Sequence, residues 1–257
     1  MMETDFRDII ISELSTELAP SLVSELIESY EKILIEFRKA AWDETLWKAG
    51  KFVENVFRLL DNLVYSRVLD QVRNMNELKK ELESLPSSKF QDSIRILIPR
   101  IATAMIYDPR SKKGAVHVKP MNPDFLDATL TVAASDWILA EFLRLYHSSD
   151  TERIQQIIKS ILVRKIPFVE KHGGVSFVTH PMKNAEDEIL LLLLDAQDGM
   201  DRKAVGISLG NTYTPGRVTQ AIDELLKKRY IIKRLDGQHV ISGPGETHIS
   251  EELSKFT

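Results

Sequence analysis

The feature that most constrains the fold is a helical spacing of apolar residues, which recurs through the first 164 residues. From Ala19 to Phe37, for example, apolar side chains return every three or four positions, and Pro20 suits a first helical turn. The expected helices cover about 19–37, 43–64, 68–85, 90–107, 123–146 and 151–164. Asp43 is expected to cap the second of them. The sequence therefore predicts a mainly α fold, with an antiparallel helical bundle over residues 1–165.

The pattern changes after residue 165. Two short β-prone runs surround Gly173-Gly174, which predicts a hairpin and linker over residues 166–182. The remainder, 183–257, shows three helices at about 186–197, 202–209 and 215–229. Two alternating strands follow, at 230–234 and 239–242, around Asp236-Gly237. Three helices and a two-stranded ribbon form the order of a small winged helix-turn-helix domain.

Composition excludes several classes of chemistry. The 257 residues contain no cysteine, which removes disulfides, thiolate zinc sites and cysteine nucleophiles. No two of the six histidines have the i, i+4 spacing of a helical metal site, so neither a metal nor a cofactor is expected. The longest apolar run, 189–194, is too short to span a bilayer, and the first residues lack a signal-peptide pattern. We expect a cytoplasmic protein without a membrane partner.

One segment is strongly basic although the whole chain has a net charge of −4. Residues 88–120 contain two acidic residues, Asp92 and Asp108. The basic residues of this segment are Lys89, Arg95, Arg100, Arg110, Lys112, Lys113 and Lys119. Local positive charge of this kind attracts phosphates. The alternative is a solvated helix face whose charges pair with nearby acids.

Within this segment, residues 108–120 contain Pro, Gly and clustered charge and are expected to form a loop that carries Arg110 and His117. Cleavage of a phosphodiester without a metal needs a permanent cation near the charge that develops on phosphorus, and arginine supplies it. It also needs a proton carrier with a pKa near neutrality, which histidine supplies. Lys112 and Lys113 add positive field. The alternative is a capping histidine in a solvated basic loop.

A second motif is rejected on its context. Gly206-Ile-Ser208-Leu-Gly210 matches the nucleophile elbow of serine hydrolases, which places the serine on a sharp turn from a strand to a helix. Here the motif ends a short predicted helix and no strand precedes it. The glycines are therefore expected to serve the turn between two helices.

The winged unit has two open interpretations. If it binds DNA, its third helix would direct Arg217, Thr219 and Gln220 toward base edges, while Lys227 and Lys228 would contact the backbone. Against this, residues 183–257 carry 10 basic and 12 acidic residues, and attraction to phosphate normally dominates affinity for DNA. Protein docking or dimerisation is the alternative.

The basic loop also has a family context. The stretches Arg110–His117, Asn122–Thr129 and Ala134–Glu141 together resemble a bacterial branch of the HEPN superfamily. Lys48–Glu54 on the second long helix is similar to the same branch. The resemblance covers roughly residues 20–147, and the winged tail resembles one that is often appended to such proteins.

The resemblance implies a dimeric helical bundle and a metal-independent endoribonuclease of a toxin–antitoxin or phage-defence system, with RNA and an antitoxin or defence-complex partner. Arg110 would bind the scissile phosphate and His117 would act as general base or acid while the 2′-hydroxyl of the RNA attacks. The implied RNA-binding residues are Ser111, Lys112, Lys113, Lys119 and Arg100, and the implied supporting residues are Glu54 and Asp127.

One position departs from the family pattern. Ser111 follows the arginine where asparagine is usual, and Pro109 precedes it. A serine hydroxyl donates and accepts hydrogen bonds over a shorter reach than a carboxamide. An inactive helical dimerisation or sensor domain, joined to a DNA-binding module as a transcriptional regulator, is therefore the alternative function.

Overall fold

The computed structural model describes residues 2–67, 70–72, 74–113, 122–147, 150–161, 166–196, 198–210, 212–253 and 255. Over these residues the protein is mainly helical, as predicted, with two antiparallel sheets of two strands each. The chain divides into two compact units, which we call the N-terminal unit (residues 1–163) and the C-terminal unit (residues 164–257). Residues 38–40 group with the C-terminal unit. Each unit is described separately.

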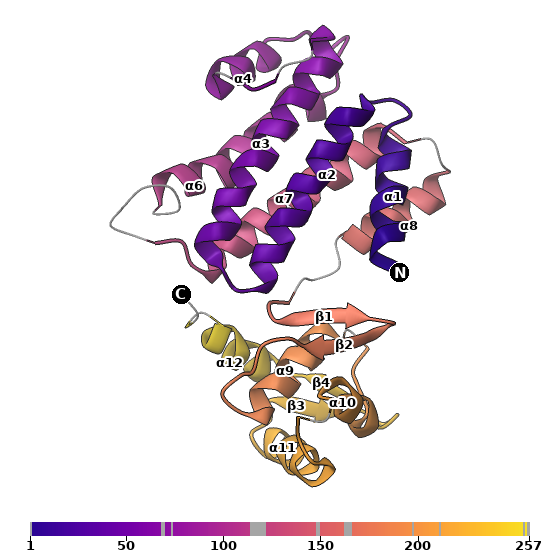
Figure 1. Cartoon of the computed structure of the whole chain (residues 1–257), viewed down its shortest axis with the longest axis vertical. Coiled ribbons are helices and arrows are strands. Elements are labelled where there is room, and N and C mark those ends of the chain that lie inside the picture. The colour runs from indigo at the N-terminus through magenta and orange to yellow at the C-terminus, as the bar shows by residue number, and fades with distance from the viewer. Residues whose placement is uncertain are drawn as a thin grey trace. The chain divides into compact units, whose positions relative to one another are not determined.

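The N-terminal unit is entirely helical in its described part (Figure 1). Its elements are α1 (Met2–Leu14), α2 (Pro20–Arg38), α3 (Trp42–Tyr65), α4 (Met75–Glu83), η1 (Ser93–Leu97), α5 (Ile98–Ile101), η2 (Ala102–Tyr107), α6 (Asp108–Lys112), α7 (Phe125–Leu145) and α8 (Thr151–Ile161).

The core of the N-terminal unit forms around α3, which packs on α7 and on η2. Phe52, Phe57 and Phe142 are fully buried there. Burying aromatic and aliphatic side chains of this size is the main source of its stability. Polar contacts fix the helix order as well: the Tyr30 hydroxyl on α2 donates to Asp136 on α7 at 2.5 Å.

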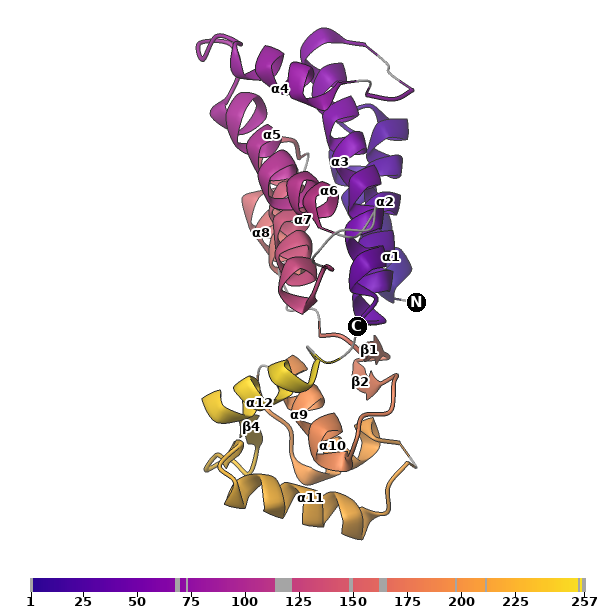
Figure 2. The same ribbon diagram turned by 90° about the vertical axis from the view of Figure 1, so that its left-hand side faces the viewer.

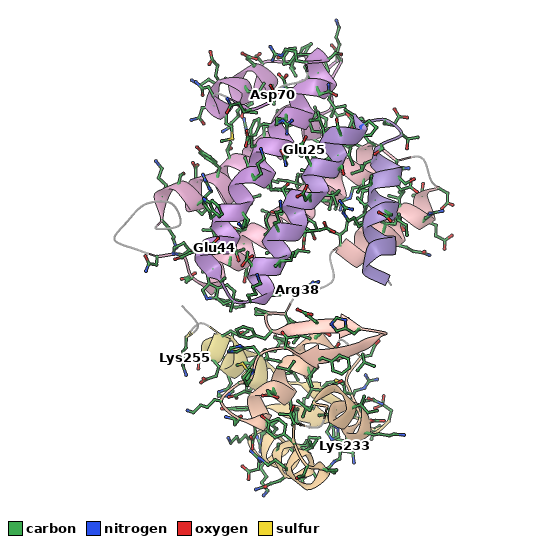
Figure 3. All side chains as sticks on the ribbon, viewed as in Figure 1. Glu25, Arg38, Glu44, Asp70, Lys233 and Lys255 are labelled. Atoms are coloured by element: carbon green, nitrogen blue, oxygen red, sulfur yellow. The ribbon has the colours of Figure 1, made fainter. Side chains whose placement is uncertain are left out.

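A partly buried ion pair joins α2 to α3. Arg58 on α3 donates to the carboxylate of Glu25 on α2, which Figure 3 labels. Asn55, one turn earlier, donates to the Glu25 backbone carbonyl at 2.9 Å. These contacts satisfy polar groups that burial would otherwise leave without partners.

Several sequence predictions for this unit are corrected. The predictions did not include α1, and the polar helix expected over 68–85 is shorter, since α4 covers only Met75–Glu83. Asp43 is not a cap: α3 begins at Trp42, and Ala41 precedes it without a side-chain hydrogen bond. The helix expected to end at 107 continues to Lys112, so Arg110 lies on a helical turn and not in a loop.

The helical run from Ser93 to Lys112 alternates between π and α geometry. The π-helical segments η1 and η2 each precede a short α-helix with a proline in its first turn, Pro99 in α5 and Pro109 in α6. Proline lacks the N–H that an uninterrupted α-helix requires, so it is tolerated where the hydrogen-bond pattern changes. This explains why Pro109 does not end the helix.

The C-terminal unit contains both sheets and the remaining helices (Figure 1). Its elements are β1 (Val169–His172), β2 (Val175–Val178), α9 (Ala185–Asp195), α10 (Arg202–Ser208), α11 (Pro215–Lys227), β3 (Ile231–Lys233), β4 (His239–Ile241) and α12 (Gly243–Leu253). The predicted hairpin is confirmed, with Val169 opposite Val178. It packs on α9 and so belongs to this unit and not to a separate linker. Helix α12 was not predicted.

Three consecutive acidic residues at the start of α9 hold this unit together. The carboxylates of residues 186–188 are bound by α11, by α12 and by the segment that precedes α11. The pairs are Glu186 with Arg217 at 2.7 Å, Asp187 with His248 at 3.0 Å and Glu188 with Tyr213 at 3.0 Å. Burial and the hydrogen bond to Glu188 raise the pKa of Tyr213 to about 12. The acids also favour the N-terminus of the helix that carries them.

A short backbone contact adds a strand-like residue beside β4. Met200 and His239 exchange backbone hydrogen bonds at 2.8 and 3.0 Å. Gly199 permits this approach, because its φ is +83° and a Cβ there would lie 2.7 Å from the His239 carbonyl oxygen. The His239 ring is buried, and burial lowers its pKa.

Two further properties concern the described residues alone. Among them, no helix combines the length and the apolar character that crossing a bilayer requires. In the same residues, no three histidine or carboxylate side chains gather in a way that would hold a metal ion.

Candidate active site

Arg110 lies on α6, which runs beside α3 in both views of the N-terminal unit (Figures 1 and 2). Its guanidinium rests on Gly50 of α3: a Cβ at that position would lie 2.6 Å from Cζ of Arg110. The ring of Tyr107, three residues earlier, has its centroid 5.8 Å from the same Cζ. The cation is therefore held between an aromatic ring and the bare backbone of a glycine.

Arg110 has no ion pair with any residue of the described segments. Its Nε is buried without a hydrogen-bond partner, although a buried donor of this kind normally has one. An arginine left unpaired beside a helix is a ready site for an anion, because its donors match the oxygens of a phosphate or carboxylate.

The three residues that follow Arg110 differ in whether their side chains already have a polar partner. Lys112 is exposed and forms no ion pair with a described residue. Lys113 donates to Asp127 on α7 at 2.6 Å. The Ser111 hydroxyl donates to the Tyr107 backbone carbonyl at 2.8 Å, a bond typical of helical serines. Among the described cations predicted around Arg110, Lys112 is thus the one without an ion pair.

Asp127 belongs to the cap of α7. Asp124 accepts a hydrogen bond from the Asp127 backbone, and Asp127 accepts one from the Asp124 backbone, which forms a capping box. The hydrogen bond that the Asp127 backbone donates is the main reason why the pKa of Asp124 is lowered. Because Lys113 also bonds to Asp127, α6 is tied to the start of α7. Asp127, predicted as a supporting residue, therefore lies next to the basic turn formed by residues 110–113.

The proton carrier predicted from sequence, His117, lies outside the described residues, as does Lys119. The described residues on either side of this segment are held together through Lys113 and Asp127.

Two other predicted residues are not brought to Arg110. Arg100 donates to Glu83 of α4 at 2.8 Å and precedes Arg110 by ten residues on the same helical run, roughly 15 Å at the α-helical rise. Glu54 accepts from Lys51 at 3.1 Å on α3. Glu54 nevertheless follows Gly50 by four residues, so both lie on one side of α3.

Sequence reasoning missed two residues that lie against the Arg110 side chain, Gly50 and Tyr107, and it also missed the exposed Trp47. Trp47, Gly50 and Glu54 share one face of α3, and the Trp47 side chain is 47% exposed. The signal was present for Trp47, since an exposed tryptophan interrupts the polar side of an amphipathic helix. For Gly50 only its position within an otherwise continuous helix was informative, because glycine is disfavoured there.

The residues predicted to contact DNA lie on α11 and just after it in the C-terminal unit. Arg217 is bound by Glu186, so its guanidinium does not extend freely from the helix. Thr219, Gln220 and Lys227 are exposed. Lys228 is exposed as well, with its Nζ 5.9 Å from the Tyr230 ring centroid. The exposed set is polar and moderately basic.

Comparisons with protein-family models, with curated proteins and with solved structures gave no match to this chain.

Proposed function

We propose that the protein is a metal-independent endoribonuclease of the HEPN type, acting in a toxin–antitoxin or phage-defence system. The observation that carries the proposal is Arg110, a guanidinium that rests on Gly50 and has no acidic partner among the described residues. Most arginines at helix surfaces pair with carboxylates, as Arg217 does in the same chain. An unpaired one beside a basic turn fits a phosphate of an incoming nucleic acid.

In the proposed reaction the 2′-hydroxyl oxygen of the RNA attacks the adjacent phosphorus. The O2′–P bond forms and the P–O5′ bond breaks, which gives a 2′,3′-cyclic phosphate and a free 5′-hydroxyl. The attacking hydroxyl loses its proton and the departing 5′-oxygen takes one up, and His117 serves one or the other of these transfers. Arg110 stabilises the charge that accumulates on the phosphoryl oxygens.

Trp47 supplies a surface for a nucleobase in this proposal. It lies on the face of α3 that also carries Gly50, where Arg110 rests. Its indole is nearly half exposed, and Lys48 places its Nζ 4.2 Å from the ring centroid. Stacking of a base on an aromatic side chain contributes about 1–3 kcal/mol. A nucleotide stacked there would lie beside the Arg110 guanidinium.

The proposal includes a homodimer. The run 93–112 and helix α7 lie side by side, since Ser93 bonds to Glu141 and Lys113 bonds to Asp127. Both expose uncharged side chains over several turns. These are Leu97, Ala104, Met105, Leu126, Leu130 and Ala133. A twofold contact places like surfaces against each other, so this mainly apolar surface, which also includes the exposed Arg100, is compatible with a second copy of itself.

A second candidate function is DNA binding by the C-terminal unit. The order α9, α10, α11, β3, β4 and the Met200 bridge to β4 favour a winged helix-turn-helix. Exposed Thr219 and Gln220 on α11 would then read bases, and Lys227 and Lys228 would contact phosphates. This function is compatible with either an active or an inactive helical unit, including a transcriptional regulator.

The deciding experiment is cleavage of RNA by the purified full-length chain in buffer with EDTA. The expected products end in a 2′,3′-cyclic phosphate and a 5′-hydroxyl, which mass spectrometry identifies. Cleavage is expected to fall at least about 10²-fold in His117→Ala and in Arg110→Ala. Equal cleavage by wild type and both variants, or no cleavage of structured and unstructured RNAs, would overturn the proposal.

A further inference from the structure

The C-terminal unit contains a cavity that neither the proposed cleavage site nor the DNA-binding surface uses. It has a volume of about 300 Å³ and lies between the hairpin β1–β2 and the C-terminal ends of α9 and α10. Cavities of about this volume and larger hold small organic ligands in other proteins. Its apolar lining includes Val175, Met200, Ala204 and Ile207, and its polar lining includes Ser176, Asp195 and Ser208.

Ser208 contributes a hydroxyl without a partner. The residue is 3% exposed, and its Oγ has no hydrogen bond. Helical serines usually donate to a carbonyl one turn earlier, as Ser111 does. A buried hydroxyl without a partner costs about 1–3 kcal/mol. Its Oγ has almost no accessible surface, so a ligand in the cavity reaches this hydroxyl only after the Ser208 side chain rotates to another staggered rotamer.

The motif around Ser208 was rejected as a nucleophile elbow from its sequence context. The structure supports this rejection. Ser208 is the last residue of α10, and the element before α10 is the helix α9 and not a strand. The serine is buried at the cavity wall and has no histidine among the lining residues. Its hydroxyl is therefore suited to binding a ligand and not to attacking one.

Asp195 places a carboxylate in the same cavity. It is the last residue of α9, and its side chain is 7% exposed. Its Oδ2 accepts from the Ser176 hydroxyl at 2.6 Å and lies 3.1 Å from Lys171 Nζ. Within the described residues, its Oδ1 has no hydrogen bond. One oxygen of a largely buried carboxylate thus remains open to a donor.

The electrostatics of the cavity favour positive charge. The carboxylate of Asp195 lies at the C-terminus of α9, where the partial charge of the helix end is also negative. Ser208 ends α10 on the same cavity, so a second helix C-terminus faces it. The one lining cation is Lys171, whose side chain is half exposed and long enough to move away. A desolvated carboxylate is stabilised by a cation that reaches it.

We propose that this cavity binds a small organic cation with an amidinium or ammonium head and an apolar body. The head donates to Asp195 Oδ1, and to Ser208 Oγ once that side chain has rotated toward the cavity, while the body packs on Val175, Met200 and Ile207. Lys171 competes with the ligand for the carboxylate and is displaced toward solvent. The site is independent of the ribonuclease proposal, since all its residues belong to the C-terminal unit.

The test is a titration of the full-length chain, observed by NMR, with three molecules of one shape and different charge. Benzamidine is the cationic probe, benzamide is its neutral counterpart and benzoate is the anion. We expect saturable binding of benzamidine at least tenfold tighter than that of benzamide, and no binding of benzoate. Absence of benzamidine binding, or equal affinity for benzamide, would overturn the proposal.

Variants locate the site. Asp195→Asn is expected to weaken benzamidine binding at least tenfold, and Ser208→Ala several-fold without lowering the unfolding temperature, since it removes an unsatisfied hydroxyl. Lys171→Gln is expected to strengthen binding, because the competing cation is gone. Asp198→Asn, an exposed neighbour outside the cavity, is the matched control and should bind as wild type does. If Asp195→Asn does not fold, Ser208→Ala and Lys171→Gln decide: unchanged affinity in both excludes this site.

Discussion

Two arginines in this chain, each near the start of a helix, have opposite environments. Arg110 of the N-terminal unit rests on Gly50 without an acid, while Arg217 of the C-terminal unit is bound by Glu186 at 2.7 Å. Each arginine has a proline before it in the first turn of its helix, Pro109 in α6 and Pro215 in α11. The difference lies in the helix that each one meets: α3 presents a glycine, and α9 presents a carboxylate.

Whether an arginine can bind an incoming anion depends on the residue that already lies against its guanidinium. A paired arginine must give up its carboxylate before it binds a phosphate, and that exchange lowers the net gain. An unpaired arginine has no such cost. Under the proposed function, Arg110 therefore binds the anion and Arg217 stabilises the C-terminal unit.

The largest effect is expected from the two arginines themselves. Arg110→Ala should lower the rate of RNA cleavage about 10²- to 10³-fold, because it removes donors that stabilise the developing charge. Arg217→Ala should leave that rate unchanged. Single-turnover cleavage assays measure both, and a loss of equal size in the two variants would contradict the distinction.

A smaller loss is expected from Gly50→Ala. The new methyl group would occupy the position of the Arg110 side chain, which is flexible and can move aside. Cleavage should fall roughly tenfold to 10²-fold through misplacement of the guanidinium, while the unfolding temperature stays close to that of wild type.

Gly206→Ala is the matched control for this variant, since a Cβ at that helical position meets no atom within 4 Å. It should keep full cleavage activity and unfold at an equal or higher temperature, because alanine favours a helix over glycine. If Gly50→Ala were as active as Gly206→Ala, the contact with Arg110 would have no functional weight.

Removing the carboxylate of Glu186 should leave Arg217 unpaired, as Arg110 is among the described residues. Glu186→Gln releases Arg217 and should destabilise the protein by about 1 kcal/mol, as expected for a partly exposed ion pair. If α11 binds DNA, affinity for duplex DNA should rise and its salt dependence should steepen by about one phosphate contact. Chemical unfolding and fluorescence anisotropy at several salt concentrations measure the two effects. Weaker DNA binding after this change would instead make Glu186 part of the binding surface.

The smallest effect concerns pH and the buried His239. Burial lowers its pKa, so the unfolded state binds more protons than the folded state below about pH 6.5. The contribution of His239 to stability is therefore complete above that pH and is lost as the pH falls. Comparing urea unfolding of wild type and His239→Gln at pH 7.5 and 5.5 isolates this contribution. The variant should lose less stability on acidification, and an equal loss would show that other groups dominate.

Much of the fold could be predicted from sequence, because helical periodicity reports which face is buried. The helices α2, α3, α7 and α11 have this local signal, while the hairpin β1–β2 was predicted from two β-prone runs around Gly173-Gly174. Helix α12 was missed because it begins at Gly243-Pro244, which is typical of a turn. The extension through Arg110 was missed since Pro109 normally ends a helix, and the π-helical turn that accommodates it leaves no mark in the sequence.

The environments of the site residues were less predictable, because they depend on residues far away in the chain. Gly50 and Arg110 are 60 positions apart, and Glu186 and Arg217 are 31 apart. The basic segment could be recognised from composition alone. Which of its cations are free could not, since Lys113 and Arg100 are each bound by a carboxylate on another helix.

The glycine beneath Arg110 has a practical consequence for work with this protein. A site that relies on a missing side chain can be closed by one methyl group and closed further by larger ones, while every reactive group of the chain is retained. If the protein is toxic to its host, a graded series from Gly50→Ala to Gly50→Val would provide versions that cells can produce in quantity. Their residual rates would then calibrate how much of the toxicity depends on the placement of one guanidinium.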